Sequence, residues 1–270
     1  MPVVETEVHG QILIVRMNRP ESLNALNAEM RQMLAETWTE FRRSPDLEVA
    51  IFTGTGRGFC AGEDMKQSLA DGAPGGRRPS IEDPFMNGAL EKPVIAAVNG
   101  YAMGGGFMLV ERTDLRVAAK GAIFEVSEAK RWLLGGYNHG HLANVPDPIA
   151  MEMALGFRFT AERFYDIGFL NRLVEPDQLI PEAMKMAEHL LTLPPASRVN
   201  TVHMMRQMRP SPTADQQRLA ALLHEHGDKG DLMESRAAFA EKRKPNFKGW
   251  KDPDDRYKLP TPESARAKYR

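Results

Sequence analysis

The sequence has few of the features that mark secreted, membrane or nucleic-acid-binding proteins. Its 270 residues include one cysteine, Cys60, which excludes an intramolecular disulfide and fits a reducing compartment. No run of 18 or more apolar residues is present, so no membrane span is expected. The formal net charge of −1 gives no reason to expect nucleic acid as a partner. The N-terminal residues lack the basic and apolar regions of a signal peptide. Together these absences predict a cytoplasmic protein.

What the sequence does contain is an apolar fraction of 42%, enough for a sizeable core. Runs rich in strand-forming residues predict strands at Ile12–Met17, Val49–Thr53, Val94–Val98 and Leu115–Ala118. After Asn27, a candidate helix cap, apolar side chains recur at helical spacing: Met30, Met33, Leu34, Trp38 and Phe41. Strands that alternate with helices favour an α/β fold.

The later part of the chain is predicted to be helical, with long charged segments at Val199–Met208 and Ala214–Arg243. The second segment has more apolar positions than a solvated helix needs, which predicts burial against neighbouring subunits: Leu219, Leu222, Leu223, Leu232, Met233 and Phe239.

Two polar segments are not expected to form regular elements. Asp71–Ser80 is rich in glycine and proline and predicts a mobile loop. Lys251–Arg270 predicts an arm or a partly ordered tail.

Two glycine-rich loops each follow a predicted strand. Gly54–Asp64 follows the strand at residues 49–53, and Gly104-Gly105-Gly106 follows the strand at residues 94–98 after a turn at Asn99-Gly100. A helix that begins at the triple glycine would aim its N–H groups and the positive end of its dipole at the point where the loops meet. Two backbone donors at one point suit an oxygen that becomes negative during a reaction. The pattern therefore predicts an oxyanion hole.

These loops resemble those of the crotonase (enoyl-CoA hydratase/isomerase) superfamily. The resembling motifs run in collinear order along nearly the whole chain, at residues 18–26, 59–64, 92–100, 104–106 and 239–245. The resemblance implies a ClpP-like superhelix of ββα units over residues 1–194, which carries the acyl-CoA site. It also implies a helical trimerisation region over residues 195–250, followed by a polar tail at residues 251–270. The implied partners are an acyl-CoA substrate and further copies of the chain, as a homotrimer or a dimer of trimers. No metal and no cofactor other than the CoA of the substrate are implied.

The resemblance also assigns catalytic roles. The backbone N–H groups of Glu63 and Gly105 would hold the thioester oxygen as it gains enolate character. Glu128 would be the acid and base, with a pKa raised by its apolar surroundings. Two-glutamate hydratases place their first glutamate two residues after the triple glycine, where this chain has Met108. Because a thioether cannot exchange a proton, one glutamate acting alone fits Δ3-Δ2 enoyl-CoA isomerisation well.

Other reactions remain open at this stage. Hydration is retained if Glu63, Tyr137 or His139 replaces the missing carboxylate. Thioester hydrolysis and carbon–carbon lyase chemistry occur on the same scaffold, and a non-catalytic CoA-binding protein is the alternative from another class. The pair His139-x-His141 has metal-ligand spacing but no third ligand nearby in the sequence, so a local structural role is expected. Glu111, one helical turn beyond Met108, is expected to form a structural ion pair.

The remaining site residues transfer from the family by position. Five residues match positions around the family's CoA: Ser22, Ala61, Glu63, Asp64 and Lys66. Phe239 and Lys242 match an aromatic residue and a lysine near the nucleotide end, often contributed by a neighbouring subunit. Met103, Met108 and Trp132 are candidate walls of the acyl pocket.

Overall fold

The computed structural model describes residues 2–72 and 78–268. Residues 73–77 of the predicted loop Asp71–Ser80 thus lie outside the described residues. The chain divides into two compact units, one formed by Met1–Glu125 with Arg158–Arg209 and the other by Val126–Phe157 with Pro210–Arg270. None of the helices in the described part is long and apolar enough to cross a membrane.

The first unit is built on a six-stranded sheet in the order β1-β2-β3-β5-β7-β10. Its strands are β1 (Val4–His9), β2 (Ile12–Met17), β3 (Val49–Gly54), β5 (Val94–Val98), β7 (Leu115–Ala119) and β10 (Arg172–Val174). β1 and β2 pair antiparallel, and all the other neighbours pair parallel. The four predicted strands are confirmed to within one residue at each end, because β-branched and apolar runs bounded by turn residues are the strongest strand signal.

A second, four-stranded sheet has the order β4-β6-β8-β9. Its strands are β4 (Gly58–Cys60), β6 (Tyr101–Met103), β8 (Ile123–Glu125) and β9 (Arg158–Thr160). Three times in succession a strand of the large sheet is followed within a few residues by a strand of the small one: β3 by β4, β5 by β6, and β7 by β8. The first two pairs lead into α2 (Met65–Ala70) and α3 (Gly105–Arg112). The predicted ββα repeat is therefore present. The first glycine-rich loop runs from the end of β3 to the start of α2, and the second joins β6 to α3.

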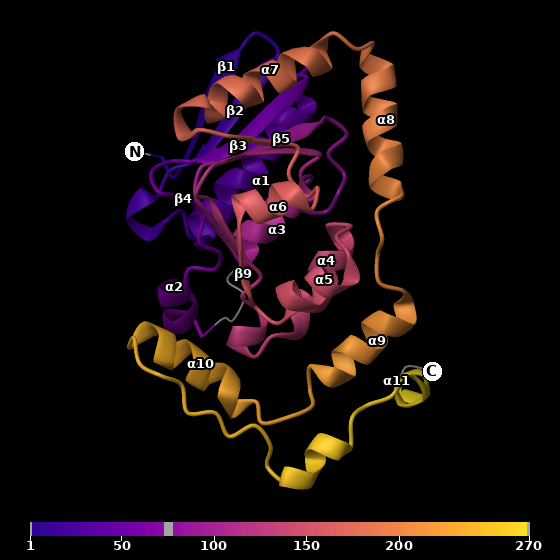
Figure 1. Ribbon diagram of the computed structural model, residues 1–270. Helices are drawn as coiled ribbons and strands as arrows, with labels where there is room; N and C mark the ends of the chain where they lie inside the picture. Colours follow the sequence, from indigo (N-terminus) through magenta and orange to yellow (C-terminus); the bar gives the residue numbers. More distant parts are fainter. Residues whose placement is uncertain (1, 73–77, 269–270) are drawn as a thin grey trace. The chain divides into compact units, whose positions relative to one another are not determined.

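Helices cover both faces of the large sheet. Side chains of alternate residues in its strands pack against α7 (Leu179–Leu191), which lies across the strands in Figure 1. On the opposite face, Trp38 of α1 (Ala28–Arg43) contacts Phe52 edge to face, with ring centroids 5.2 Å apart. The side chain of Asn27 accepts the N–H of Met30 at 2.8 Å, which confirms it as the cap of α1. The unit also contains η1 (Pro20–Ser22), α6 (Ala161–Asp166), η4 (Pro176–Gln178) and α8 (Pro195–Gln207).

The described residues of the second unit form helices joined by irregular segments, without a strand. The unit contains η2 (Ala129–Arg131), η3 (Leu134–Asn138), α4 (His139–Leu142), α5 (Asp147–Ala154), α9 (Ala214–Leu223), α10 (Gly230–Ala240), η5 (Pro253–Tyr257) and α11 (Pro262–Lys268). The segment Ala214–Arg243 is thus two helices, interrupted where Gly227 has a φ of +113°. Within the segment expected as a tail, α11 packs on α9, and Arg266 pairs with Asp215 at 2.8 Å.

Candidate active site

The two glycine-rich loops of the first unit meet at the start of α3. Gly104 precedes the helix with φ +50° and ψ −116°, a conformation that side chains oppose, and its N–H donates to the carbonyl of Glu125 at 2.8 Å. Gly62 has φ +88°, and a Cβ added to it would lie 2.7 Å from the carbonyl oxygen of Met103 and 3.2 Å from the nitrogen of Gly105. The backbones of the loops are therefore in contact, and a residue larger than glycine does not fit at position 62.

The hydrogen bonds around this contact fix the direction of the backbone at Glu63. Leu26 forms a parallel bridge with Glu63, in which the N–H of Leu26 donates to Gly62 at 2.7 Å and its carbonyl accepts from Asp64 at 3.2 Å. In such a bridge Glu63, which lies between the two bonded residues Gly62 and Asp64, directs its own N–H and C=O away from Leu26. Gly105 is the first residue of α3, so its N–H has no acceptor within the helix. The structure thus brings together the loops that carry both predicted donors.

Cys60 lies beside these loops but has no nucleophilic character. Its side chain is fully buried, and burial raises the pKa of the thiol to about 12. It is therefore a neutral thiol at physiological pH. The N–H of Gly62 points at its sulfur at 3.4 Å, so the residue supports the loop.

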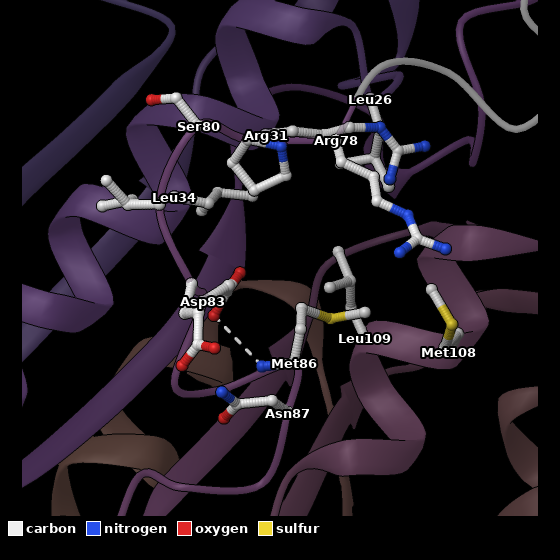
Figure 2. A pocket seen from close by; sticks show the side chains of 13 residues that line it. Leu26, Arg31, Leu34, Arg78, Ser80, Asp83, Met86, Asn87, Met108 and Leu109 are labelled. Atoms are coloured by element: carbon white, nitrogen blue, oxygen red, sulfur yellow. Dashed lines mark hydrogen bonds between the residues drawn. The ribbon is translucent and has the colours of Figure 1, made fainter.

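A pocket of about 720 Å³ adjoins the meeting point of the loops within the first unit (Figure 2). Leu26 and Met108 line it, and Leu26 would lie 3.3 Å from a Cβ added to Gly105. The other lining residues are Arg31, Leu34, Arg78, Pro79, Ser80, Ile81, Glu82, Asp83, Met86, Asn87 and Leu109. Met108 thus lines a pocket beside the glycine loops, whereas Met103 contributes its carbonyl to the loop contact.

Glu111 lies one turn beyond Met108 but is not part of the pocket lining. Its side chain is buried, and its charge raises the pKa values of Arg116 and Arg209, although burial lowers both by a larger amount. These opposing charges agree with the structural role expected for Glu111.

Four of the described charged residues line the pocket, and the sequence reasoning missed all of them: Arg31, Arg78, Glu82 and Asp83. Burial lowers the pKa of Arg31 and raises that of Asp83. Arg31 precedes Leu34 by three residues and so lies on the apolar stripe of α1. A charged residue at such a position could have marked Arg31 as a candidate site residue. Asp83 lies in an irregular segment, where it accepts the N–H groups of Phe85 and Met86 at 2.9 and 3.0 Å, and no sequence pattern marked it.

In the second unit, Glu128 and His139 come together. Nε2 of His139 lies 3.8 Å from Oε1 of Glu128, and the two side chains are 9% and 17% exposed. A Cβ added to Gly136 would lie 3.6 Å from that of Glu128, so the intervening turn folds back toward the base of the Glu128 side chain. Tyr137 belongs to the same turn and is half-buried, whereas His141 is exposed. Among the described residues, no group of three His, Cys, Asp or Glu side chains is placed to hold a metal ion.

An aromatic and cationic patch lies elsewhere in the second unit. Phe239 is 53% exposed, and the guanidinium of Arg131 lies 4.2 Å from its ring centroid. Lys130 and Lys242 line the same pocket of about 270 Å³. Rings and cations of this kind suit a nucleotide and its phosphates. Trp132, predicted as an acyl-pocket wall, packs edge to face against His224, with centroids 5.5 Å apart.

The remaining predicted CoA residues lie in the first unit, where several make structural contacts. Asp64 caps α2 by accepting the N–H of Gln67 at 3.2 Å and pairs with Arg19 at 3.0 Å. The hydroxyl of Ser22 donates to the carbonyl of Arg19 at 3.2 Å. The N–H of Ala61 donates to Leu23 at 2.9 Å, and Lys66 is exposed. Binding of CoA by these residues stays a prediction.

Comparison with known proteins identifies the family. Residues 7–251 match the family model described as enoyl-CoA hydratase/isomerase. The chain is 34% identical to an enoyl-CoA hydratase of Mycobacterium tuberculosis, in an alignment that covers 91% of this chain and 96% of the relative. It is also 34% identical to the (E)-benzylidenesuccinyl-CoA hydratase of Thauera aromatica, with 92% and 100% covered.

Solved structures agree with the sequence relatives. The carnitinyl-CoA hydratase of Mycobacterium avium superposes with a TM-score of 0.78 at 28% identity, covering 92% of this chain and 99% of that one. An enoyl-CoA hydratase of M. tuberculosis gives a TM-score of 0.70 at 34% identity, with 92% and 100% covered. The chain has the crotonase fold and belongs to the enoyl-CoA hydratase/isomerase family.

Proposed function

We propose that this protein transforms acyl-CoA thioesters through an enolate whose oxygen is held by the N–H groups of Glu63 and Gly105. The observation that supports the proposal is the contact of the two glycine-rich loops at the start of α3, where the positive end of the helix dipole lies. Relatives named as hydratases and a dehydratase of CoA thioesters support the same class of substrate.

Within this class we propose reversible hydration of a 2-enoyl thioester, with Glu128 as the acid and base. The carboxylate takes a proton from water as the water oxygen attacks the β-carbon. The electron pair of the carbon–carbon double bond then forms the bond between the α-carbon and the carbonyl carbon, and the carbonyl π pair moves onto the thioester oxygen. The enolate then collapses as its α-carbon takes a proton from Glu128. His139, whose Nε2 lies 3.8 Å from Oε1 of Glu128, would orient that carboxylate in place of a second glutamate.

The runner-up is Δ3-Δ2 isomerisation, in which Glu128 moves one proton between two carbons and no water is needed. Met108 at the vacant glutamate position favours it. Thioester hydrolysis, carbon–carbon cleavage and CoA binding without catalysis are the further alternatives. Mass spectrometry of products from a panel of enoyl-, β-keto- and aryl-acyl-CoAs separates them. A gain of one water by 2-enoyl-CoAs is the expected result; tight CoA binding with no product from any thioester would contradict the proposal.

A glutamate at position 108 is expected to improve hydration. The Met108→Glu variant adds a carboxylate to the pocket beside the glycine loops, where it would serve as a second acid and base with Glu128. Two carboxylates that serve one reaction can divide its roles, so that one donates a proton while the other activates water. The measurement is the loss of enoyl-thioester absorbance at equal folded concentrations. Met108→Gln, of similar size but without a titratable group, is the control and should give no gain.

We also propose a trimer-based assembly. None of the side chains of α9 is buried within the single chain, and Met233 and Phe239 of α10 are 50% and 53% exposed. In unit 1, Met204, Met205 and Met208 are also exposed, at 58%, 61% and 67%. Burial of such apolar surface between copies would stabilise an oligomer. Sedimentation at micromolar concentration should therefore give a trimer or hexamer; a stable 30.2 kDa monomer would contradict this.

A further inference from the structure

The pocket beside the glycine loops contains a cation that the proposed hydration does not use. Arg31 extends from α1 into a lining that includes the apolar side chains of Leu34, Met86 and Leu109 and the charged residues Arg78, Glu82 and Asp83. Burial lowers the pKa of its guanidinium, which means that the surroundings disfavour its charge. An arginine side chain nevertheless remains ionised at neutral pH. The pocket therefore carries a permanent positive charge in a poorly solvated place.

No carboxylate of the described residues forms a hydrogen bond with the buried Nε of Arg31. Glu63 raises the pKa of Arg31, but by less than burial lowers it. Asp83, at the other end of the lining in Figure 2, is engaged by the N–H groups of Phe85 and Met86. Residues 73–77, outside the described part, contain no acidic residue in the sequence.

A second arginine lies at the same part of the pocket. Figure 2 shows the side chains of Arg31 and Arg78 extending toward the same side of the lining, where Met108 also lies. Arg78 is exposed, so its charge is well solvated. The lining also holds the acidic residues Glu82 and Asp83, and among its described residues Arg31 is the cation for which burial lowers the pKa. A planar guanidinium pairs with a carboxylate through two parallel hydrogen bonds.

We propose that this pocket recognises an acyl group bearing its own carboxylate, so that the substrates are CoA thioesters of dicarboxylic acids. The proposal rests on the proposed function, since it takes the thioester oxygen to lie at the glycine loops. From there, Leu26 and Met108 lead into the pocket. The acyl chain then runs along the apolar lining, and its terminal carboxylate pairs with Arg31. Leu34 and Leu109 exclude water from that pair.

The first test measures binding, so that it does not depend on turnover. Titration calorimetry compares adipoyl-CoA with hexanoyl-CoA, two saturated thioesters that differ by the terminal carboxylate and cannot be hydrated. The wild type is expected to bind adipoyl-CoA more tightly. Arg31→Met should remove that preference by lowering the affinity for adipoyl-CoA about 10–100-fold. Arg31→Lys should restore part of the lost affinity. Equal affinities of the wild type for both thioesters would overturn the proposal.

Binding of free CoA distinguishes the other source of an anion. If Arg31→Met lowers the affinities for free CoA and for both thioesters by the same factor, then Arg31 binds a phosphate of CoA and the proposal is wrong. Turnover then separates this inference from the function on which it rests. Activity on trans-2-hexenoyl-CoA equal to that on trans-2-hexenedioyl-CoA would leave hydration standing and overturn the carboxylate preference. Tight, Arg31-dependent binding of adipoyl-CoA without turnover of any enoyl thioester would support the anion site and contradict the proposed function.

Discussion

Replacing Glu128 by glutamine is expected to lower turnover by about 10²–10⁴-fold, the usual contribution of general acid–base catalysis. The amide keeps the shape of the side chain and its place beside His139 but cannot exchange a proton. Affinity for a saturated acyl-CoA should change little, because the lost group acts on the reacting carbons. Initial rates at saturating enoyl-CoA and calorimetric binding of hexanoyl-CoA measure the two quantities separately.

Glu188→Gln is the matched control for this variant. Glu188 is exposed on α7 in the first unit, so the same chemical change there should leave turnover within error of the wild type. If Glu128→Gln retains full turnover, Glu128 is not the acid and base. The same substitution at Glu63, and His139→Asn, would then identify the group that moves the proton.

Replacing Gly62 by alanine is expected to cost both stability and at least about 10²-fold in turnover. The backbone at this position has φ +88°, which costs an L-residue about 1–2 kcal/mol. The added methyl group would also lie 2.7 Å from the carbonyl of Met103 and 3.2 Å from the nitrogen of Gly105, so the loops must separate. Loss of one oxyanion donor alone typically lowers turnover by about 10²–10³-fold. Thermal unfolding and initial rates measure the two effects.

Gly168→Ala separates the strain of the backbone from the displacement of the loops. Gly168 has nearly the same φ, +81°, in the same unit, but an added Cβ meets no atom within 4 Å. The Gly168→Ala variant should therefore lose stability while its turnover stays unchanged. Equal turnover of the two alanine variants would mean that the contact between the loops does not position a catalytic donor.

The sequence predicted the parts of the fold that depend on local patterns. Ile12–Met17 and Val94–Val98 are strands with the predicted bounds, and Asn27 caps the helix that follows it. Ala214–Arg243, in contrast, is divided into two helices at Gly227. A glycine lowers helix propensity by only about 1 kcal/mol. Its propensity alone was too weak a signal to predict the break.

The candidate site was predictable only where the motif is local. The glycine loops are short sequence signals, and their meeting follows from parallel strands whose ends lie at one edge. The approach of His139 to Glu128 depends on how the intervening turn folds around Gly136, which no periodicity encodes. Arg31 and Asp83 join one pocket from segments about 50 residues apart, a tertiary contact that one sequence does not reveal.

Exchange of α-protons tests the central claim, an enolate formed on a thioester, without assuming which reaction follows. A saturated thioester such as hexanoyl-CoA is incubated with the protein in D₂O, and its mass is followed. The wild type is expected to introduce deuterium at the α-carbon, and both Glu128→Gln and Gly62→Ala should slow the exchange strongly. Binding of hexanoyl-CoA by the wild type with exchange no faster than in buffer would contradict the account.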